Sequence, residues 1–231
     1  MKTELLKNSV YISLFIQVII AIITFSGMFL KVPEDDKSLI DILTLENVSQ
    51  AIEAIFYSYI AFTLSKLDYN TVTPKRYFDW VITTPVMLIT TILFMDYEIK
   101  KKNNEKPLRL LEFLKQNKNI VLKIVFYNFM MLVFGYLGET GLMDKNISVP
   151  IGFVFFFLSF YTIYNNYVKD RNISINKNLF LFLLIVWGLY GVAAMLPNIE
   201  KNISYNFLDI ISKNFYGLYI YFKVLNISKQ N

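Results

Sequence analysis

Residues 206–225, NFLDIISKNFYGLYIYFKVL, form a hydrophobic run with a lysine near its middle. About 20 mainly apolar residues are enough for one helix to cross the hydrocarbon core of a membrane. Lys213 has seven residues of this run before it and twelve after it, so it lies too deep to be an interfacial anchor, which is the role we expect of Lys223. A charge at that depth costs about 2.5–3.5 kcal/mol and usually faces a partner inside the protein. The run therefore predicts a transmembrane helix with a functional lysine.

The rest of the chain repeats this hydrophobic pattern. Six further runs lie at residues 9–30, 46–66, 78–96, 120–138, 150–168 and 178–196. The 231 residues are 55% hydrophobic with a mean hydropathy of +0.43, which is more apolar surface than a water-soluble domain can bury. No cleavage-site pattern accompanies the first run, so we expect it to be a retained helix. The sequence predicts an all-α, multi-pass membrane protein whose single domain, residues 1–231, is a seven-helix bundle in lipid.

Charged residues between the runs predict the orientation of this bundle. The third-to-fourth and fifth-to-sixth connections are rich in cations: Lys100, Lys101, Lys102, Lys106, Arg109, Lys115, Lys118, Lys169, Arg171 and Lys177. Alternate connections carry Glu139, Asp144 and Glu200 instead. Cytoplasmic loops are enriched in Lys and Arg, so we expect the N-terminus outside and the C-terminus in the cytoplasm. This distribution also explains the net charge of +5 without a nucleic-acid partner.

Two connecting segments and the composition complete the outline. In the connection 97–119, the spacing of Leu110, Phe113 and Leu114 among cations predicts a short amphipathic helix on the cytoplasmic surface. The acidic segment 31–45 is interpreted as a turn. The chain has no Cys and no His, which excludes disulfides, thiolate or imidazole metal ligands and His-based catalysis. We expect no metal site and no enzymatic activity.

Ionisable residues within the runs indicate what the bundle does. They are Glu53, Arg76, Asp79, Asp209 and Lys213. Asp209 and Lys213 are four residues apart and should share one face of the last helix. A desolvated lysine amine can condense with an aldehyde, and the resulting cation needs carboxylates nearby. Asp79 and Asp209 would supply them, with Arg76 offsetting the second negative charge.

These residues carry a resemblance to a known family. The stretch Arg76-Tyr77-Phe78-Asp79-Trp80-Val81-Ile82-Thr83-Thr84-Pro85 resembles the third helix of microbial rhodopsins, and Asp209-Ile210-Ile211-Ser212-Lys213 resembles their retinal-binding seventh helix. The resemblance implies all-trans retinal bound covalently to Lys213, Asp79 as counter-ion and proton acceptor, Asp209 as second counter-ion, and Arg76 on the outer side. It also implies a set of pocket residues: Trp80 and Trp187 on the two faces of the polyene, with Tyr57, Thr83, Thr84, Met131, Gly135, Phe156, Ser159 and Tyr190 around it.

A light-driven outward proton pump is one function open to such a protein. In this family a pump usually has a carboxylic acid on the cytoplasmic side of the third helix, about three turns after the acceptor. Thr90 stands at that position, and a hydroxyl cannot serve as proton donor at neutral pH. The pump is therefore the second hypothesis, followed by a sensory rhodopsin that signals through a transducer protein.

A light-gated cation channel is the first hypothesis. Glu53 in the second helix and Asn214 directly after the lysine, with Ser13 or less favourably Ser9 from the first helix, resemble the Ser–Glu–Asn central gate of channelrhodopsins. Small rhodopsins of giant algal viruses have a similar trio. The gate would open to protons, Na⁺, K⁺ and Ca²⁺ once water enters it. Alternative roles for Glu53 are a helix-packing hydrogen bond, a contact in a homo-oligomer or an internal proton donor.

One further pair follows from the same resemblance. Thr84 and Asn128 stand where channelrhodopsins have a hydrogen-bonded pair that links the third and fourth helices. The usual Cys and Asp are replaced here.

Overall fold

The protein is a bundle of long helices in the computed structural model, which describes residues 2–63 and 69–230. The last three residues of the predicted second span, 64–66, lie outside the described residues, as do the two end residues of the predicted domain. The described residues contain no β-strand. The long helices are α1 (Lys2–Ser26), α2 (Lys37–Thr63), α3 (Tyr69–Lys102), α5 (Lys118–Glu139), α6 (Lys145–Ile163) and α7 (Ser174–Ala194), and the last span consists of α8 (Asn198–Asp209), the π-helical turn η4 (Ile210–Asn214) and α9 (Phe215–Ser228).

Each predicted span matches one of these helices, but the helix ends differ from the ends of the runs. The segment 31–45 is not simply a turn, because α2 already begins at Lys37 after a short 3₁₀ turn at Glu34–Asp36. Leu39, Ile42 and Leu43 of this segment are fully buried, and their 3–4-residue spacing favours a helix. The hydrophobic run located the membrane-spanning part but not the helix end.

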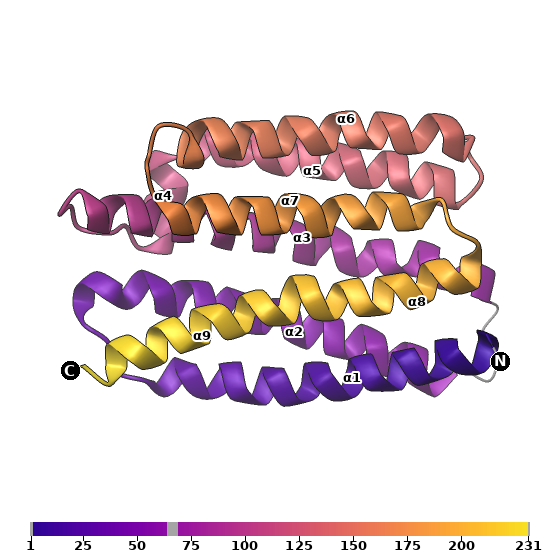
Figure 1. Cartoon of the computed structure of the whole chain (residues 1–231), viewed down its shortest axis with the longest axis horizontal. Helices are drawn as coiled ribbons and strands as arrows, with labels where there is room; N and C mark the ends of the chain where they lie inside the picture. Colours follow the sequence, from indigo (N-terminus) through magenta and orange to yellow (C-terminus); the bar gives the residue numbers. More distant parts are fainter. Residues whose placement is uncertain (1, 64–68, 231) are drawn as a thin grey trace.

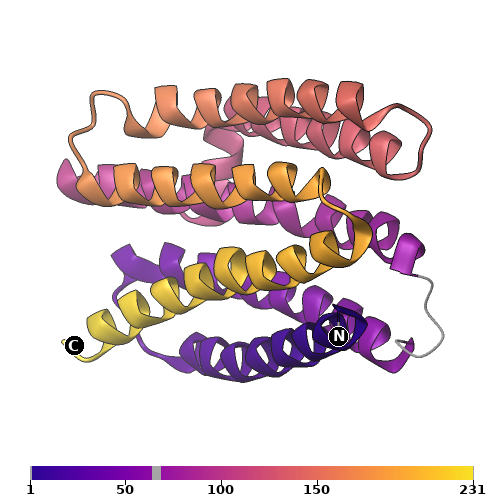
Figure 2. The same cartoon turned by 45° about the vertical axis from the view of Figure 1, so that its right-hand side comes forward.

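The helices pack in a closed ring that follows chain order. Each of α1, α2, α3, α5, α6, α7 and α8 contacts the next, and α8 returns to α1. The long helices lie roughly side by side in both views (Figures 1 and 2). The N-terminus and the C-terminus lie at opposite ends of the bundle (Figure 1), as an odd number of spans requires.

The short helix α4 (Leu110–Gln116) forms where the sequence predicted an amphipathic helix. Phe113 is fully buried whereas Leu111 is 70% exposed. This helix, the connection between α6 and α7, and the C-terminus all lie at one end of the bundle (Figure 1). The two cation-rich connections therefore share an end with the C-terminus, which is the arrangement that the positive-inside rule requires.

Two of the seven spans are less hydrophobic than the rest. Five helices of the described chain, α1, α3, α5, the α6 segment and α7, are long and apolar enough to cross a membrane by composition. The exceptions are α2, whose buried face carries Glu46, Gln50 and Glu53, and the last span, which contains Asp209 and Lys213. These two helices contact each other, so the buried polar residues of α2 lie next to those of the last span.

Candidate functional site

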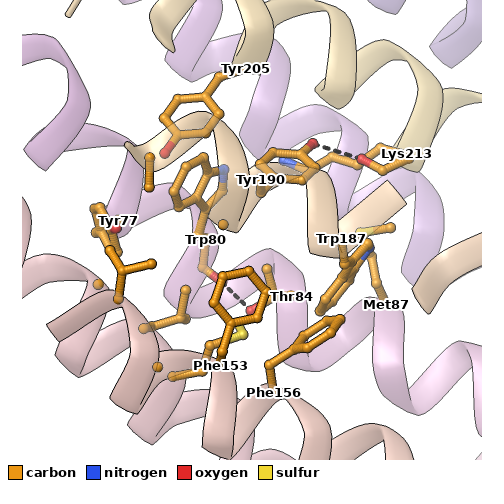
Figure 3. A pocket seen from close by; sticks show the side chains of 18 residues that line it. Tyr77, Trp80, Thr84, Met87, Phe153, Phe156, Trp187, Tyr190, Tyr205 and Lys213 are labelled. Atoms are coloured by element: carbon orange, nitrogen blue, oxygen red, sulfur yellow. Dashed lines mark hydrogen bonds between the residues drawn. The ribbon is translucent and has the colours of Figure 1, made fainter. Parts of the chain in front are cut away.

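A cavity lies inside the bundle, with Lys213 in its wall (Figure 3). The wall is mainly aromatic and aliphatic and comes from α3, α5, α6, α7 and the last span: Tyr77, Trp80, Thr84, Met87, Met131, Leu132, Gly135, Val149, Gly152, Phe153, Phe156, Trp187, Tyr190, Gly191, Ala194, Tyr205, Ser212 and Lys213. Such a cavity suits a hydrophobic ligand attached at one end to an amine.

Most of the predicted pocket residues lie in this wall. They are Trp80, Thr84, Met131, Gly135, Phe156, Trp187 and Tyr190, together with Lys213. Three predicted residues do not. Tyr57 donates a hydrogen bond to Asp209 instead, at 2.6 Å. Thr83 bonds back to the carbonyl of Asp79, and Ser159 bonds to the carbonyl of Ile124 on the neighbouring helix, so helix packing takes up both hydroxyls.

Other wall residues were missed by sequence reasoning, although helical spacing could have indicated them. Tyr77 precedes Trp80 by three residues, and Phe153 precedes Phe156 by three, so each shares a helix face with a predicted residue. A Cβ on Gly191 would come within 2.3 Å of the Phe153 ring. Glycine therefore allows this ring to lie against α7.

Two carboxylates flank the Lys213 amine. Its Nζ donates to Asp79 Oδ2 at 2.9 Å and lies 3.3 Å from Glu53 Oε1. All three side chains are at most 3% exposed. A buried cation requires such partners because removing one of them would leave an uncompensated charge. Asp79 was predicted in this position; Glu53 was predicted for a gate and also lies beside the lysine.

Asp209 has a different set of partners from the one its spacing suggested. It accepts hydrogen bonds from Tyr57 at 2.6 Å and Tyr190 at 2.7 Å and pairs with Arg76 at 3.2 Å. No ion pair joins it directly to Lys213 among the described residues. The π-helical turn Ile210–Asn214 begins directly after Asp209 and widens the helix, so the α-helical i, i+4 relationship does not hold there.

Arg76 closes the site on the side of the N-terminus. Its guanidinium is fully buried and donates to Tyr57 and to Asn202, both at 3.1 Å, and to Asn206. Arg76 and Lys213 together face three carboxylates, those of Glu53, Asp79 and Asp209. With all groups ionised the cluster has a formal charge of −1, so it can hold one more proton without becoming cationic.

The three predicted gate residues are buried, but they form no hydrogen bond with one another in the described part of the chain. The Ser13 hydroxyl donates to the Asn206 carbonyl and accepts from Gln17. Glu53 faces Lys213. Both side-chain polar atoms of Asn214 are buried without a partner. The closed Ser–Glu–Asn ring that the sequence predicted is thus not formed among the described residues.

The pair predicted to link the third and fourth spans is present. Asn128 donates from Nδ2 to the hydroxyl of Thr84 at 2.8 Å, and Thr84 donates to the Trp80 carbonyl at 2.7 Å. This bond joins α5 to α3 at the cavity wall.

A further buried acid, Glu46, was not singled out by sequence reasoning. Glu46 is fully buried and accepts a hydrogen bond from Thr90 at 2.5 Å. Thr90 stands where a pump would have its proton donor. Glu46 of α2 therefore places a carboxyl group next to a position at which α3 has only a hydroxyl. The buried polar stripe Glu46, Gln50, Glu53 and Tyr57, with its 3–4-residue spacing, was the signal.

The sequence itself identifies the family of this fold. Residues 8–227 match the profile of the family described as bacteriorhodopsin-like protein. The chain belongs to the bacteriorhodopsin-like family. Proteins of this family are retinal photoreceptors of the membrane that act as light-driven transporters or sensors and not as enzymes.

Solved structures agree with this membership. The chain is similar to viral rhodopsin OLPVRII, with a TM-score of 0.82 and 30% identity over 96% of this chain and 99% of that one. The blue-light-absorbing proteorhodopsin from Med12 shares the fold, with a TM-score of 0.73, 19% identity and 98% and 99% of the two chains covered. So does the proton-pumping rhodopsin AR2 from the marine alga Acetabularia acetabulum, with a TM-score of 0.74, 22% identity and 98% and 97% covered. No curated protein sequence matches the chain.

The cavity fits the cofactor of the family. Bacteriorhodopsin-like proteins bind retinal covalently through a lysine Schiff base, and retinal is the cofactor of this chain. Among the residues that form the cavity wall, Lys213 is the lysine. An apolar, aromatic wall suits a polyene, and the carboxylates of Asp79 and Glu53 suit the cation at its attached end.

Proposed function

We propose that this bacteriorhodopsin-like protein is a light-gated cation channel with retinal on Lys213. The observation that carries the proposal is a set of buried polar atoms along α1, α2 and η4 that have no hydrogen-bond partner among the described residues. They include Gln17 Oε1, Gln50 Nε2, both oxygens of Glu53 and both polar atoms of Asn214. We call Ser13, Gln17, Gln50, Glu53 and Asn214 the polar seam. A buried polar group without a hydrogen-bond partner costs free energy. Water that enters the seam would bond to these groups and would be stabilised there.

The polar stripe of α2, which includes the seam residues Gln50 and Glu53, runs along the bundle in the direction an ion must take. Glu46, Gln50, Glu53 and Tyr57 lie on one face of α2, and from Glu46 to Tyr57 this stripe extends about 16 Å at 1.5 Å per residue. Gln50 accepts a hydrogen bond from Thr24 of α1 at 2.9 Å. On the other side its amide lies where a Cβ on Gly217 of α9 would be, at 2.3 Å. Three helices thus meet closely at the seam, and a small separation would open it.

The residues of the chain have separate roles in this proposal. Retinal supplies light absorption and the change of shape that starts the cycle. Asp79, whose Oδ1 has no partner, can accept a proton next to Lys213. Glu53 is then released from its pairing with the Lys213 amine, and its carboxylate favours cations in the hydrated seam. Arg76, bound by Asp209 and the two asparagines, closes the route toward the N-terminal end.

Orientation and cargo follow from the same features. We place the N-terminus outside and the C-terminus in the cytoplasm, because the cation-rich connections share the C-terminal end. Protons, Na⁺ and K⁺ are the proposed permeating ions, with Ca²⁺ as a divalent candidate. The outward faces of the helices leave room for a homo-oligomer.

Current–voltage recording under illumination tests the channel. We expect a photocurrent that reverses sign as the imposed cation gradient is changed, because ions then move passively. A current that stays outward at every accessible voltage would contradict the channel.

An outward proton pump is the second candidate, and Glu46 is the observation that favours it. A buried carboxyl group hydrogen-bonded to Thr90 can act as an internal proton donor. The pump predicts acidification of the medium by illuminated vesicles without any cation gradient. A channel produces no net proton movement under these conditions.

A further inference from the structure

Three cationic side chains without acidic partners lie where α4 meets α5. Lys115, Lys118 and Lys123 are exposed, and no ion pair joins them to a carboxylate within residues 2–63 and 69–230. We call these three lysines the basic corner. Five other cations of the same end are paired: Lys37 with Glu34, Lys100 with Glu105, Lys101 with Asp36, Arg109 with Asp41 and Lys223 with Glu98. Lys169, Lys177 and Lys229 are exposed without an ion pair among the described residues and serve as the comparison for the corner.

The fold holds the basic corner together. Asn117 joins α4 to α5: its N–H donates to the Phe113 carbonyl at 2.9 Å, and its own carbonyl accepts from Val121 at 3.0 Å. The fully buried Phe113 ring anchors α4. Lys118 lies on the same face of α5 as Leu122, four residues later. Lys123 lies about 7.5 Å further along the helix than Lys118 and about 140° around it, so its flexible stem has to bring its amine toward the corner.

An exposed apolar stripe continues from this corner along α5. Leu122 is 55% exposed, Phe126 55% and Phe129 48%, and their spacing places them on one face of the helix. The stripe runs toward the middle of the bundle and therefore faces lipid tails. On the other side of the corner, Leu111 of α4 is also exposed.

We propose that the basic corner binds the headgroup of an anionic phospholipid, with an acyl chain on Leu122, Phe126 and Phe129. Lysine ammonium groups bind phosphate as point charges, and clusters of Lys or Arg at the end of a transmembrane helix attract anionic lipids. A free phosphate would use the lysines alone, whereas a lipid also uses the stripe. This proposal does not depend on whether the protein is a channel or a pump.

Native mass spectrometry of the full-length, retinal-bound protein in detergent tests the site. The probes are phosphatidylserine and phosphatidylcholine with identical acyl chains. We expect tighter binding of phosphatidylserine and about a fivefold loss of affinity for each lysine removed, so about 100-fold in K115Q/K118Q/K123Q. The matched control K169Q/K177Q/K229Q removes the same charge from the same end of the bundle and should stay within about threefold of the original.

Three outcomes would overturn the site. The first is an equal loss of affinity for phosphatidylserine in both triple variants, which would mean that the lipid is attracted by the overall positive charge of this end. The second is equal affinity for the two lipids. The third is competition by water-soluble glycerophosphoserine as effective as that by the lipid, which would indicate an anion site without a role for the stripe. Unchanged visible absorption of each variant verifies that the bundle is folded, and L122Q/F126Q should weaken lipid binding while leaving the lysines in place.

Discussion

Glu53 of α2 and Lys213 of η4 bring a carboxylate oxygen and an amine nitrogen to within 3.3 Å of each other in the middle of the bundle. The same amine binds Asp79 of α3. One proposed gate residue therefore contacts the proposed attachment point of retinal directly. An event at the lysine can reach the polar seam through this contact, without any intervening residue.

The attachment point is the first prediction. Lys213→Ala should abolish visible absorption of the protein reconstituted with retinal, because the cavity wall then contains no amine. Lys223→Ala removes a lysine ten residues further along the same span and should leave the absorption intact. Colour that survives in Lys213→Ala would disprove the assignment.

Glu53 should control the photocurrent. Glu53→Gln keeps the shape of the side chain and removes its charge, and we expect the cation current to fall about tenfold, the effect of about 1.4 kcal/mol on the barrier to permeation. The current at saturating light, normalised to the amount of bound retinal, measures this. Ser159→Ala, which removes a hydroxyl outside the seam, should leave the current unchanged; equal effects of both changes would argue against a gate at Glu53.

Glu46 distinguishes the two candidate functions. For a channel, Glu46→Gln should change the amplitude of the current and leave the recovery of the visible absorption after a flash within about twofold. For a pump, the loss of an internal proton donor should slow that recovery by about 10²-fold or more, the usual contribution of a positioned acid. Flash spectroscopy of the two proteins side by side decides between the candidates.

The hydrogen bond between Thr84 and Asn128 should stabilise the contact of α3 with α5. Thr84→Val leaves the buried Asn128 amide without its acceptor, at a cost of about 1–3 kcal/mol. Thr84→Val/Asn128→Leu removes both partners and should cost less than the sum of the two single changes. The thermal loss of visible absorption gives the stability of the original protein, the two single variants and the double variant. If the costs of the two single changes simply add up in the double variant, the hydrogen bond does not couple the two residues.

A buried ion pair at the end of the bundle opposite the C-terminus gives the fifth prediction. Glu139 pairs with Lys201 at 2.5 Å and with Lys145 at 3.0 Å, and the Lys201 side chain is fully buried. Glu139→Gln leaves the buried Lys201 cation without its carboxylate partner and should destabilise the protein by about 3–5 kcal/mol. Glu139→Leu/Lys201→Met removes both charges and should recover most of this stability. Equal loss in the single and the double variant would show that packing, not charge, is the cause.

The hydrophobic runs predicted the bundle well because lipid imposes a simple rule. A span must be about 20 residues long, must be apolar and must satisfy its backbone internally, so composition alone located all seven helices. Helix ends were less predictable. Residues 37–45 are helical although the segment was interpreted as a turn, because Leu39, Ile42 and Leu43 pack inside the bundle, and that partner surface is not visible in a linear sequence.

The wall of the cavity was predictable where a residue lies on a helix beside a recognised one. Trp80, Trp187 and Lys213 were predicted from the family resemblance, and Tyr77 and Phe153 could have been inferred from their spacing to predicted residues. Thr83 and Ser159, which were predicted for the pocket, do not line the cavity, because whether a hydroxyl faces a cavity or a backbone carbonyl depends on the rotation of its helix. A shift of one residue changes this rotation by 100°, and spacing alone fixes it only loosely.

By itself, the sequence determined that seven helices cross a membrane and that Lys213 needs carboxylate partners, because length, hydropathy and the cost of a buried charge act on each helix separately. Only the tertiary structure decided which carboxylates these are. Lys213 is flanked by Asp79 and Glu53, while Asp209 binds Arg76 and two tyrosines. Pairing depends on distances between helices and on the π-helical turn that contains the lysine, and both arise only when the ring of helices closes.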